Sequence, residues 1–260
     1  MPFLTAAGRR LDYRWIEPGR PGRPALVFLH EGLGSVELWK DFPDQAAEAT
    51  GCGTLVYSRY GYGRSDRLEG PRGVDYMHRE ALDSLPAVLD ALDIREPVLV
   101  GHSDGASIAL IHAGTGRWSP RGLVLAAPHV FVEDVTVESI AAAKTIYRET
   151  DMPRKFARYH DDPDATFRGW NDIWLHPDFR AWNIEEYLPG VRCPMLLVQG
   201  LDDEYGTLAQ LDAIERGAGG PVERLELADC RHSPHRDQPA ATLAAIAHFV
   251  DALAPAGDRS

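Results

Sequence analysis

Short apolar runs, bounded by glycine, proline or polar residues, recur along the chain and alternate with stretches of helical spacing. Runs of this kind are typical of strands that are buried on both faces of a parallel sheet. The pattern predicts strands at residues 25–29, 54–57, 98–101, 123–127 and 194–198, and a more polar last strand at 223–227. Partial alternation on either side of Ala7-Gly8 predicts an opening antiparallel hairpin between residues 3 and 17.

Helical patterns separate the predicted strands. Between residues 76 and 92, for example, apolar positions fall on one face of a helix. Further helices are expected at residues 36–50, from Ser103 to about 113, at 207–216 and at 240–253. Repeated strand–helix units predict the α/β class, with a doubly wound, mostly parallel sheet of eight strands. Ligands then bind at the carboxyl ends of the strands.

The alternation stops between residues 129 and 189. This segment predicts helices at 138–150 and 153–159 but no buried strand, and it is rich in aromatic residues. These include Phe167, Trp170, Trp174, Phe179, Trp182 and Tyr187. We therefore expect a helical cap at 129–189, inserted between the two parts of the core, 1–128 and 190–260. Its aromatic side chains form the core of the cap or line the roof of an apolar substrate pocket.

The charge balance narrows the range of partners. With 39 acidic and 27 basic residues, the 260-residue chain has a formal net charge of −12, which argues against nucleic acid or an anionic membrane as a partner. The three cysteines have no metal-ligand spacing and fit reduced thiols better than a disulfide framework. No secretory signal or membrane-length apolar run is evident, so we expect a cytoplasmic protein.

The segment Gly101-His102-Ser103-Asp104-Gly105 matches the pattern G-x-S-x-G at the junction of a predicted strand and a helix. The chain turns sharply at such a junction, which requires small residues on both sides of the serine and exposes its hydroxyl at the helix N-terminus. This position favours a nucleophile over a glycine-rich turn that happens to hold a serine. We therefore expect Ser103 to be a catalytic nucleophile.

A serine hydroxyl needs a general base, and the base needs an acid that fixes its tautomer. His232 follows the last predicted strand and is the best candidate for the base, whereas His235 is expected to pack locally. Asp202, Asp203 and Glu204 follow the preceding strand, and only one of them can point at His232. The chain order of serine, acid and histidine is that of one large hydrolase fold.

Five motifs together resemble the α/β-hydrolase family with a cap, and the likeness covers nearly the whole chain. They are His30–Gly34, Gly61–Ser65, Gly101–Gly105, Gly200–Asp203 and His232–Pro234. The resemblance implies that Asp203 is the acid, because the family's acid stands three residues after the glycine that ends its strand. It also implies an oxyanion hole formed by the backbone N–H groups of Gly32 and Asp104, and a cap that sets substrate specificity. Candidates to line the substrate pocket are Leu33, His102, Trp39, Trp170 and Trp174.

Two positions depart from the family pattern. The family's loop has glycine after its histidine, where this chain has Glu31. A carboxylate aimed into the oxyanion hole would oppose the negative charge that the hole stabilises. We therefore expect Glu31 to point away, toward a basic partner such as Arg59 or Arg64. Arg231 stands where the family has glycine before the base, so this position must accept a side chain.

The sequence thus predicts a serine hydrolase that cleaves a carboxylic ester or lactone of a small, partly apolar substrate through an acyl-enzyme, with no metal or organic cofactor required. One alternative is a carbon–carbon bond hydrolase of ring-cleavage diketone acids, although no convincing pair of cationic anchors is evident. Another is a non-catalytic ligand receptor on the same scaffold, which the complete triad disfavours. A perhydrolase or haloperoxidase would use the same residues, whereas the family's haloalkane dehalogenases carry a carboxylate where Ser103 stands.

Overall fold

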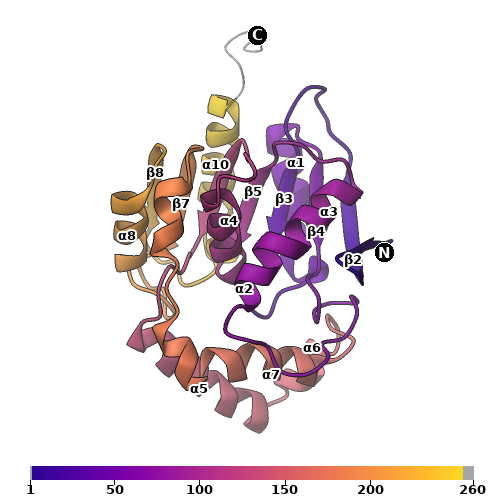
Figure 1. The fold of residues 1–260 in the computed structure, drawn as a ribbon, viewed down its shortest axis with the longest axis vertical. Coiled ribbons are helices and arrows are strands. Elements are labelled where there is room, and N and C mark those ends of the chain that lie inside the picture. The colour runs from indigo at the N-terminus through magenta and orange to yellow at the C-terminus, as the bar shows by residue number, and fades with distance from the viewer. Residues whose placement is uncertain (1, 254–260) are drawn as a thin grey trace.

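Eight strands form a single sheet at the centre of the computed structural model, which describes residues 2–253 (Figure 1). The strands are β1 (Phe3–Ala6), β2 (Arg9–Ile16), β3 (Leu26–Leu29), β4 (Thr54–Tyr57), β5 (Val98–His102), β6 (Gly122–Ala126), β7 (Met195–Gly200) and β8 (Val222–Leu227). Their order in the sheet is β1-β2-β4-β3-β5-β6-β7-β8. The β1–β2 and β2–β4 pairs are antiparallel and the other pairs are parallel, which confirms the predicted α/β class and the mostly parallel sheet.

The central strands are buried on both faces, which explains their continuous apolar runs. Every residue of β3, β4, β5, β6 and β7 is buried. The edge strand β8 is only partly buried, and it accordingly carries three charged residues, Glu223, Arg224 and Glu226. Because parallel strands end on the same side of a sheet, the loops after β3, β5, β6, β7 and β8 meet there.

Helices cover both faces of the sheet (Figure 1). One buried core contains side chains such as Phe42 of α1 and Phe249 of α10, and the other contains Leu85 of α3 and Ile108 of α4. These core elements are η1 (Val36–Trp39), α1 (Phe42–Thr50), α2 (Tyr76–Arg79), η2 (Glu80–Ser84), α3 (Leu85–Ala91), α4 (Asp104–Gly114), α8 (Ala209–Gly217), α9 (Pro234–Asp237) and α10 (Pro239–Leu253). Within the described residues, no helix is both long enough and apolar enough to cross a membrane.

Two of the expected helices are interrupted. The single helix expected at 36–50 is a 3-10 turn, η1, followed by α1, because Lys40 adopts a φ of 56°, which lies outside the helical region. The helix expected at 76–92 contains a π-helical turn, η2, between α2 and α3. Pro86 follows this turn and lacks the N–H group that a regular helix would use there.

Five helical elements lie between β6 and β7 in the chain. They are α5 (Asp134–Glu149), α6 (Met152–Phe156), α7 (Pro163–Trp174), η3 (Pro177–Ala181) and η4 (Glu185–Gly190). In Figure 1, α5, α6 and α7 lie together across one end of the sheet. The first two overlap the helices predicted for this segment, whereas α7 is an additional helix over its aromatic-rich part. We propose that residues 129–189 act as the expected cap.

The additional helix α7 has an N-terminal cap and one buried aromatic face. The Asp162 carboxylate accepts a hydrogen bond from the backbone N–H of Ala165, at 3.0 Å, as expected of a capping residue. Phe167, Trp170 and Trp174 follow at helical spacing, and all three are buried. These aromatic residues therefore both stabilise the inserted segment and face the core of the molecule.

Hydrogen bonds from the inserted segment fix it to the loops after β3 and β4. The ring of His160 accepts from the Gly63 N–H through Nδ1, at 2.9 Å, so its Nε2 carries the hydrogen and donates to the Leu33 carbonyl oxygen, at 3.0 Å. The Thr166 hydroxyl donates to the Gly61 carbonyl oxygen, at 2.9 Å. The inserted segment is therefore fastened to backbone on two core loops.

The close approach of α4 to β3 yields a prediction about stability. A Cβ at Gly105 would lie 2.0 Å from the Leu29 carbonyl oxygen, which is a backbone atom that cannot easily move away. We expect Gly105→Ala to lower the free energy of unfolding by about 3 kcal/mol, the upper part of the range for overpacked cores. At Gly19 the nearest atom to an added Cβ is 3.8 Å away, so the control Gly19→Ala should change stability by less than about 0.5 kcal/mol. Equal urea midpoints for the two variants would contradict this packing argument.

Candidate active site

Ser103 lies at a strained turn between β5 and α4. Its φ of 52° and ψ of −118° are rare for a residue other than glycine, and they are characteristic of a nucleophile elbow. A Cβ at Gly101 would lie 2.5 Å from the Gly105 carbonyl oxygen, and a Cβ at Gly105 would lie 2.0 Å from the Leu29 carbonyl oxygen. The positions two residues before and two residues after Ser103 therefore have no room for a side chain. The requirement for small neighbours, predicted from the sequence, thus has a direct steric cause.

Asp203 and His232 are brought into contact by the ends of β7 and β8. The His232 Nδ1 lies 2.8 Å from Asp203 Oδ1 and 3.0 Å from Oδ2. Burial raises the pKa of the Asp203 carboxyl, but the charge and hydrogen bond of His232 outweigh burial and hold this pKa below its ordinary value. The carboxylate therefore stays ionised and favours the tautomer in which Nδ1 carries a hydrogen and Nε2 faces away from it.

The acidic residues on either side of Asp203 take other roles. Asp202 is exposed, and its backbone N–H donates to the Cys230 carbonyl oxygen. The Glu204 carboxylate accepts from the His232 backbone N–H, at 3.3 Å, and pairs with Arg231, at 3.0 Å. The Arg231 side chain is 68% exposed, so this position accepts a long side chain by directing it outward.

Ser103 and His232 line the same cavity, which has a volume of about 330 Å³. Within residues 2–253, no hydrogen bond joins the Ser103 hydroxyl to the His232 ring. In the absence of substrate, catalytic hydrogen bonds of this kind are commonly long and shorten only in the reacting complex. The structure thus brings Ser103 and His232 to one cavity, with Asp203 directly behind the imidazole.

Four of the five residues expected in the pocket line this cavity, and one does not. Leu33, His102, Trp170 and Trp174 contribute to its wall. Trp39 instead lies outside the cavity, because its ring packs into the core against Phe28, Phe42 and His235. Its position in the turn η1 directs it toward the sheet rather than toward the inserted segment. The other lining residues include Glu31, Leu38, His129, Thr136, Ile140, Met152, Phe156, Glu204, Tyr205, Ser233 and Arg236.

The loop after β3 passes very close to the inserted segment. A Cβ at Gly32 would lie 2.1 Å from Cδ1 of Trp170, so only glycine fits beside this tryptophan. Both residues line the cavity. The backbone at Gly32 therefore runs along the cavity wall with no side chain between it and a bound molecule.

A fully buried arginine holds the backbone that leads into Gly32 and lies beside the Asp104 carboxylate. The Arg59 Nη2 donates to the carbonyl oxygens of His30, at 3.2 Å, and Glu31, at 3.0 Å, and lies 3.7 Å from Asp104 Oδ2. The Tyr76 hydroxyl donates to the same Asp104 oxygen, at 2.7 Å. The Arg59 guanidinium thus contacts both the residues directly before Gly32 and the residue directly after Ser103.

The prediction that the Glu31 carboxylate pairs with Arg59 or Arg64 is wrong. Arg59 contacts only the backbone carbonyl of Glu31, and Arg64 pairs with Glu37 at 3.0 Å. The Glu31 carboxylate lies 3.6 Å from Nδ1 of His102 and also lines the cavity. Sequence reasoning missed this partner because the two residues lie 71 positions apart and meet only when β3 and β5 pair.

Sequence reasoning also missed His129, which lines the cavity and lies 5.7 Å from the His232 ring, centre to centre. It stands three residues after the end of β6, so its position after a buried strand was an available signal. Burial and the nearby His232 lower the pKa of His129 to about 3, so its ring is neutral at neutral pH. The local packing expected for His235 is confirmed, because its buried ring contacts Trp39 and Phe42.

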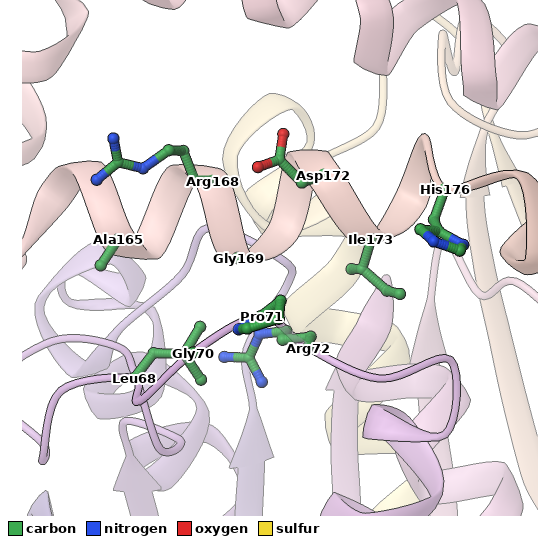
Figure 2. A pocket seen from close by; sticks show the side chains of 10 residues that line it. All are labelled: Leu68, Gly70, Pro71, Arg72, Ala165, Arg168, Gly169, Asp172, Ile173 and His176. Carbon is green, nitrogen blue, oxygen red and sulfur yellow. The ribbon is translucent and has the colours of Figure 1, made fainter.

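A second groove lies beside α7 (Figure 2). It runs between α7 and the segment from Leu68 to Arg72, and none of its lining residues also lines the cavity at Ser103. The Arg72 guanidinium donates to the Tyr60 carbonyl oxygen, at 3.0 Å.

Within residues 2–253, no group of three or more acidic, histidine or cysteine side chains is arranged to hold a metal ion.

Comparisons with known proteins agree with this architecture. A curated 2-succinyl-6-hydroxy-2,4-cyclohexadiene-1-carboxylate synthase from Salmonella paratyphi C is 33% identical over 112 residues, which are 43% of this chain and 41% of that protein. The chain thus aligns with less than half the length of this relative.

Two solved structures show the same fold over nearly the whole chain. A proline iminopeptidase from Mycobacterium smegmatis superposes with a TM-score of 0.78 at 19% identity, covering 97% of this chain and 98% of that one. An enol-lactonase from Burkholderia xenovorans LB400 gives 0.74 at 19% identity, covering 96% and 100%. The profile of the alpha/beta hydrolase family matches residues 26–246. On this evidence the chain belongs to the alpha/beta hydrolase family.

Proposed function

We propose that the chain is a serine hydrolase that cleaves a carboxylic ester or lactone of a small, partly apolar substrate. The observation that carries this proposal is the contact of His232 Nδ1 with Asp203, at 2.8 Å, beside a cavity that also exposes Ser103. The strained backbone of Ser103 supports it, because such strain persists where function requires a fixed side-chain position. The proposal also agrees with membership of a hydrolase family.

In the proposed mechanism, the Ser103 hydroxyl attacks the substrate carbonyl carbon while His232 Nε2 takes its proton. Asp203 holds the Nδ1–H and stabilises the imidazolium that forms. The imidazolium then gives its proton to the leaving alcohol oxygen, which leaves an acyl group on Ser103. A water molecule that loses a proton to His232 attacks the acyl carbon. The bond from this carbon to the Ser103 Oγ then breaks, and His232 gives the proton to that oxygen as the carboxylic acid leaves.

The negative charge on the carbonyl oxygen requires N–H donors that are already in place. We assign this role to the backbone N–H groups of Gly32 and Asp104. Two observations support the assignment: Gly32 lies on the cavity wall without a side chain, and Asp104 begins α4, whose N-terminus carries partial positive charge. Arg59 and Tyr76 hold the Asp104 side chain inside the core and away from the reacting atoms.

The cavity fits a small and partly apolar molecule. Its wall on the side of the inserted segment includes Ile140, Met152, Phe156, Trp170 and Trp174. A volume of about 330 Å³ lies at the lower end of the range for small-molecule sites. The apolar wall and the limited volume favour a short acyl or alkyl group over a long chain.

One observation favours the carbon–carbon hydrolase alternative, because an arginine, Arg236, lines the cavity and could attract an acidic substrate. Arg236 is exposed, however, and the same cavity is lined by Glu31 and Glu204, which repel anions. A panel of short esters, lactones and a dienone acid separates the two reactions. The ester–lactone proposal requires faster turnover of the neutral substrates.

The role of Ser103 is tested by removing its hydroxyl. We expect Ser103→Ala to lower kcat for a short p-nitrophenyl ester by at least about 10⁴-fold, because no nucleophile remains. A fluorophosphonate probe should label the wild type at Ser103 and should leave this variant unlabelled. Ser119→Ala, at an exposed serine, is the matched control. Turnover by Ser103→Ala within about tenfold of wild type would reject the mechanism, and an unlabelled, inactive wild type would favour a receptor.

The choice of acid is tested with two neighbouring aspartates. Asp203→Asn should lower kcat by about 10³- to 10⁴-fold, because the amide favours the wrong histidine tautomer and cannot stabilise the imidazolium. Asp202→Asn should retain kcat within about threefold, since its side chain points into solvent. Circular dichroism spectra that match the wild type would show that both variants are folded. Similar losses for the two variants would show that Asp203 has no special role.

A further inference from the structure

The buried histidine directly before Ser103 connects several loops of the site. His102 ends β5, its side chain is 1% exposed, and its Nε2 lies 2.7 Å from the carbonyl oxygen of His232. A carbonyl oxygen only accepts hydrogen bonds, so the His102 Nε2 carries a hydrogen and donates it. His102 thereby holds the main chain of the residue to which we assign the role of general base.

The second ring nitrogen of His102 faces a carboxylate. Its Nδ1 lies 3.6 Å from Glu31 Oε2, and this buried nitrogen makes no hydrogen bond within residues 2–253. Since Nε2 is protonated, a neutral ring would present a lone pair at Nδ1, which repels a carboxylate. The arrangement is attractive only when a second proton lies between the two groups.

The proton lies on His102 because a carboxyl group is ordinarily a stronger acid than an imidazolium. Burial raises the pKa of the Glu31 carboxyl, but the interaction with His102 outweighs burial and holds this pKa below its ordinary value. Burial and the charge of His102 hold the pKa of His235 well below its ordinary value. Burial and His232 do the same for His129.

The groups that face His102 come from three elements. They are Glu31 from the loop after β3, His129 from the segment after β6, and, from the segment after β8, His232 and the α9 residue His235. Of these histidines, His232 contacts a carboxylate of its own, Asp203. Among the histidines around the site, His102 and His232 each face a carboxylate.

The loop after β3 is shaped to hold the Glu31 side chain in this position. The Gly34 N–H and the Arg59 Nη2 donate to the Glu31 carbonyl oxygen, at 3.1 and 3.0 Å. A Cβ at Gly34 would lie 2.4 Å from Glu31 Oε2, so only glycine leaves room for the carboxylate. The fold of the loop therefore fixes the backbone of Glu31 and leaves room for its carboxylate beside Gly34.

We propose that Glu31 and a protonated His102 form a positioning pair that fixes the loop carrying His232 relative to Ser103. The charge-assisted hydrogen bond from the His102 Nε2 to the His232 carbonyl oxygen is stronger than one from a neutral ring. Glu31 and His102 take no part in proton transfer and act only through the placement of His232. This proposal rests on the proposed function, because the placement matters only if His232 is the base.

The pair makes the site sensitive to alkaline pH. As the pH rises and His102 loses the proton at Nδ1, its lone pair faces the Glu31 carboxylate, and the His232 loop loses its charge-assisted contact. In Glu31→Gln, the carboxamide N–H₂ can donate to the lone pair on Nδ1 of a neutral His102. The contact between position 31 and His102 therefore does not depend on a proton at Nδ1. The wild type should therefore lose activity on the alkaline side of its pH profile, and Glu31→Gln should not.

Nuclear magnetic resonance of the histidine rings tests the pair without reference to catalysis. With ¹⁵N-labelled histidine, we expect the His102 ring, assigned by its absence in His102→Gln, to carry hydrogens on both nitrogens near neutral pH in the wild type. In Glu31→Gln it should become neutral, with the hydrogen on Nε2. Glu37→Gln, which removes a carboxylate of η1 that pairs with Arg64, should leave the ring doubly protonated. A neutral His102 ring in the wild type would overturn the proposal, even if Ser103 and His232 proved catalytic.

The pH profile of kcat/KM then tests the positioning role. We expect the wild type and Glu37→Gln to lose at least about tenfold from their optimum on the alkaline side, and Glu31→Gln to show a plateau there. An alkaline loss of the same size in Glu31→Gln would overturn the positioning role. If none of the proteins hydrolyses any substrate, the proposed function fails, while the ring protonation still decides whether the pair exists.

Discussion

The close backbone approach between the start of α4 and the end of β3 is the constraint on which the rest of the site depends. Gly105 lies directly against the Leu29 carbonyl group, and this contact fixes where α4 begins. Ser103 is consequently held at a positive φ, at a cost of roughly 1–3 kcal/mol that the buried packing of α4 offsets. The same geometry points the Asp104 side chain inward, to Tyr76.

Buried charges then organise the loops around this turn. Arg59 holds the carbonyl groups that precede Gly32 and lies beside the carboxylate of Asp104, so the two proposed oxyanion donors belong to segments that share one cation. Asp203 and Glu204 hold the His232 ring and its backbone N–H from one side. Asp203 and Glu204 thus contact different groups of His232, the ring and the backbone N–H.

The strands, Ser103 and His232 were predictable from the sequence, because buried parallel strands leave continuous apolar runs and these two residues follow such runs. The strand pattern left three neighbouring acids open, and only the family resemblance implied Asp203 among them. Contacts between distant loops were not predictable in this way. The carboxylate of Glu31 turns to His102 because strand pairing places them together, and no local pattern encodes that. Lys40 interrupts a helix through a backbone angle that the apolar pattern does not show. The helix α7 was not predicted, although Phe167, Trp170 and Trp174 have helical spacing. The prediction for this segment used its aromatic content and not its spacing.

A crystal structure of the chain after reaction with a small alkyl fluorophosphonate would test the central claim most directly. Such an adduct imitates the tetrahedral intermediate of ester hydrolysis. The account predicts phosphorus bonded to the Ser103 Oγ, a phosphoryl oxygen about 3 Å from the backbone nitrogens of Gly32 and Asp104, and the His232 Nε2 facing the adduct. Phosphorus on another residue, or a phosphoryl oxygen directed away from both amides, would contradict it.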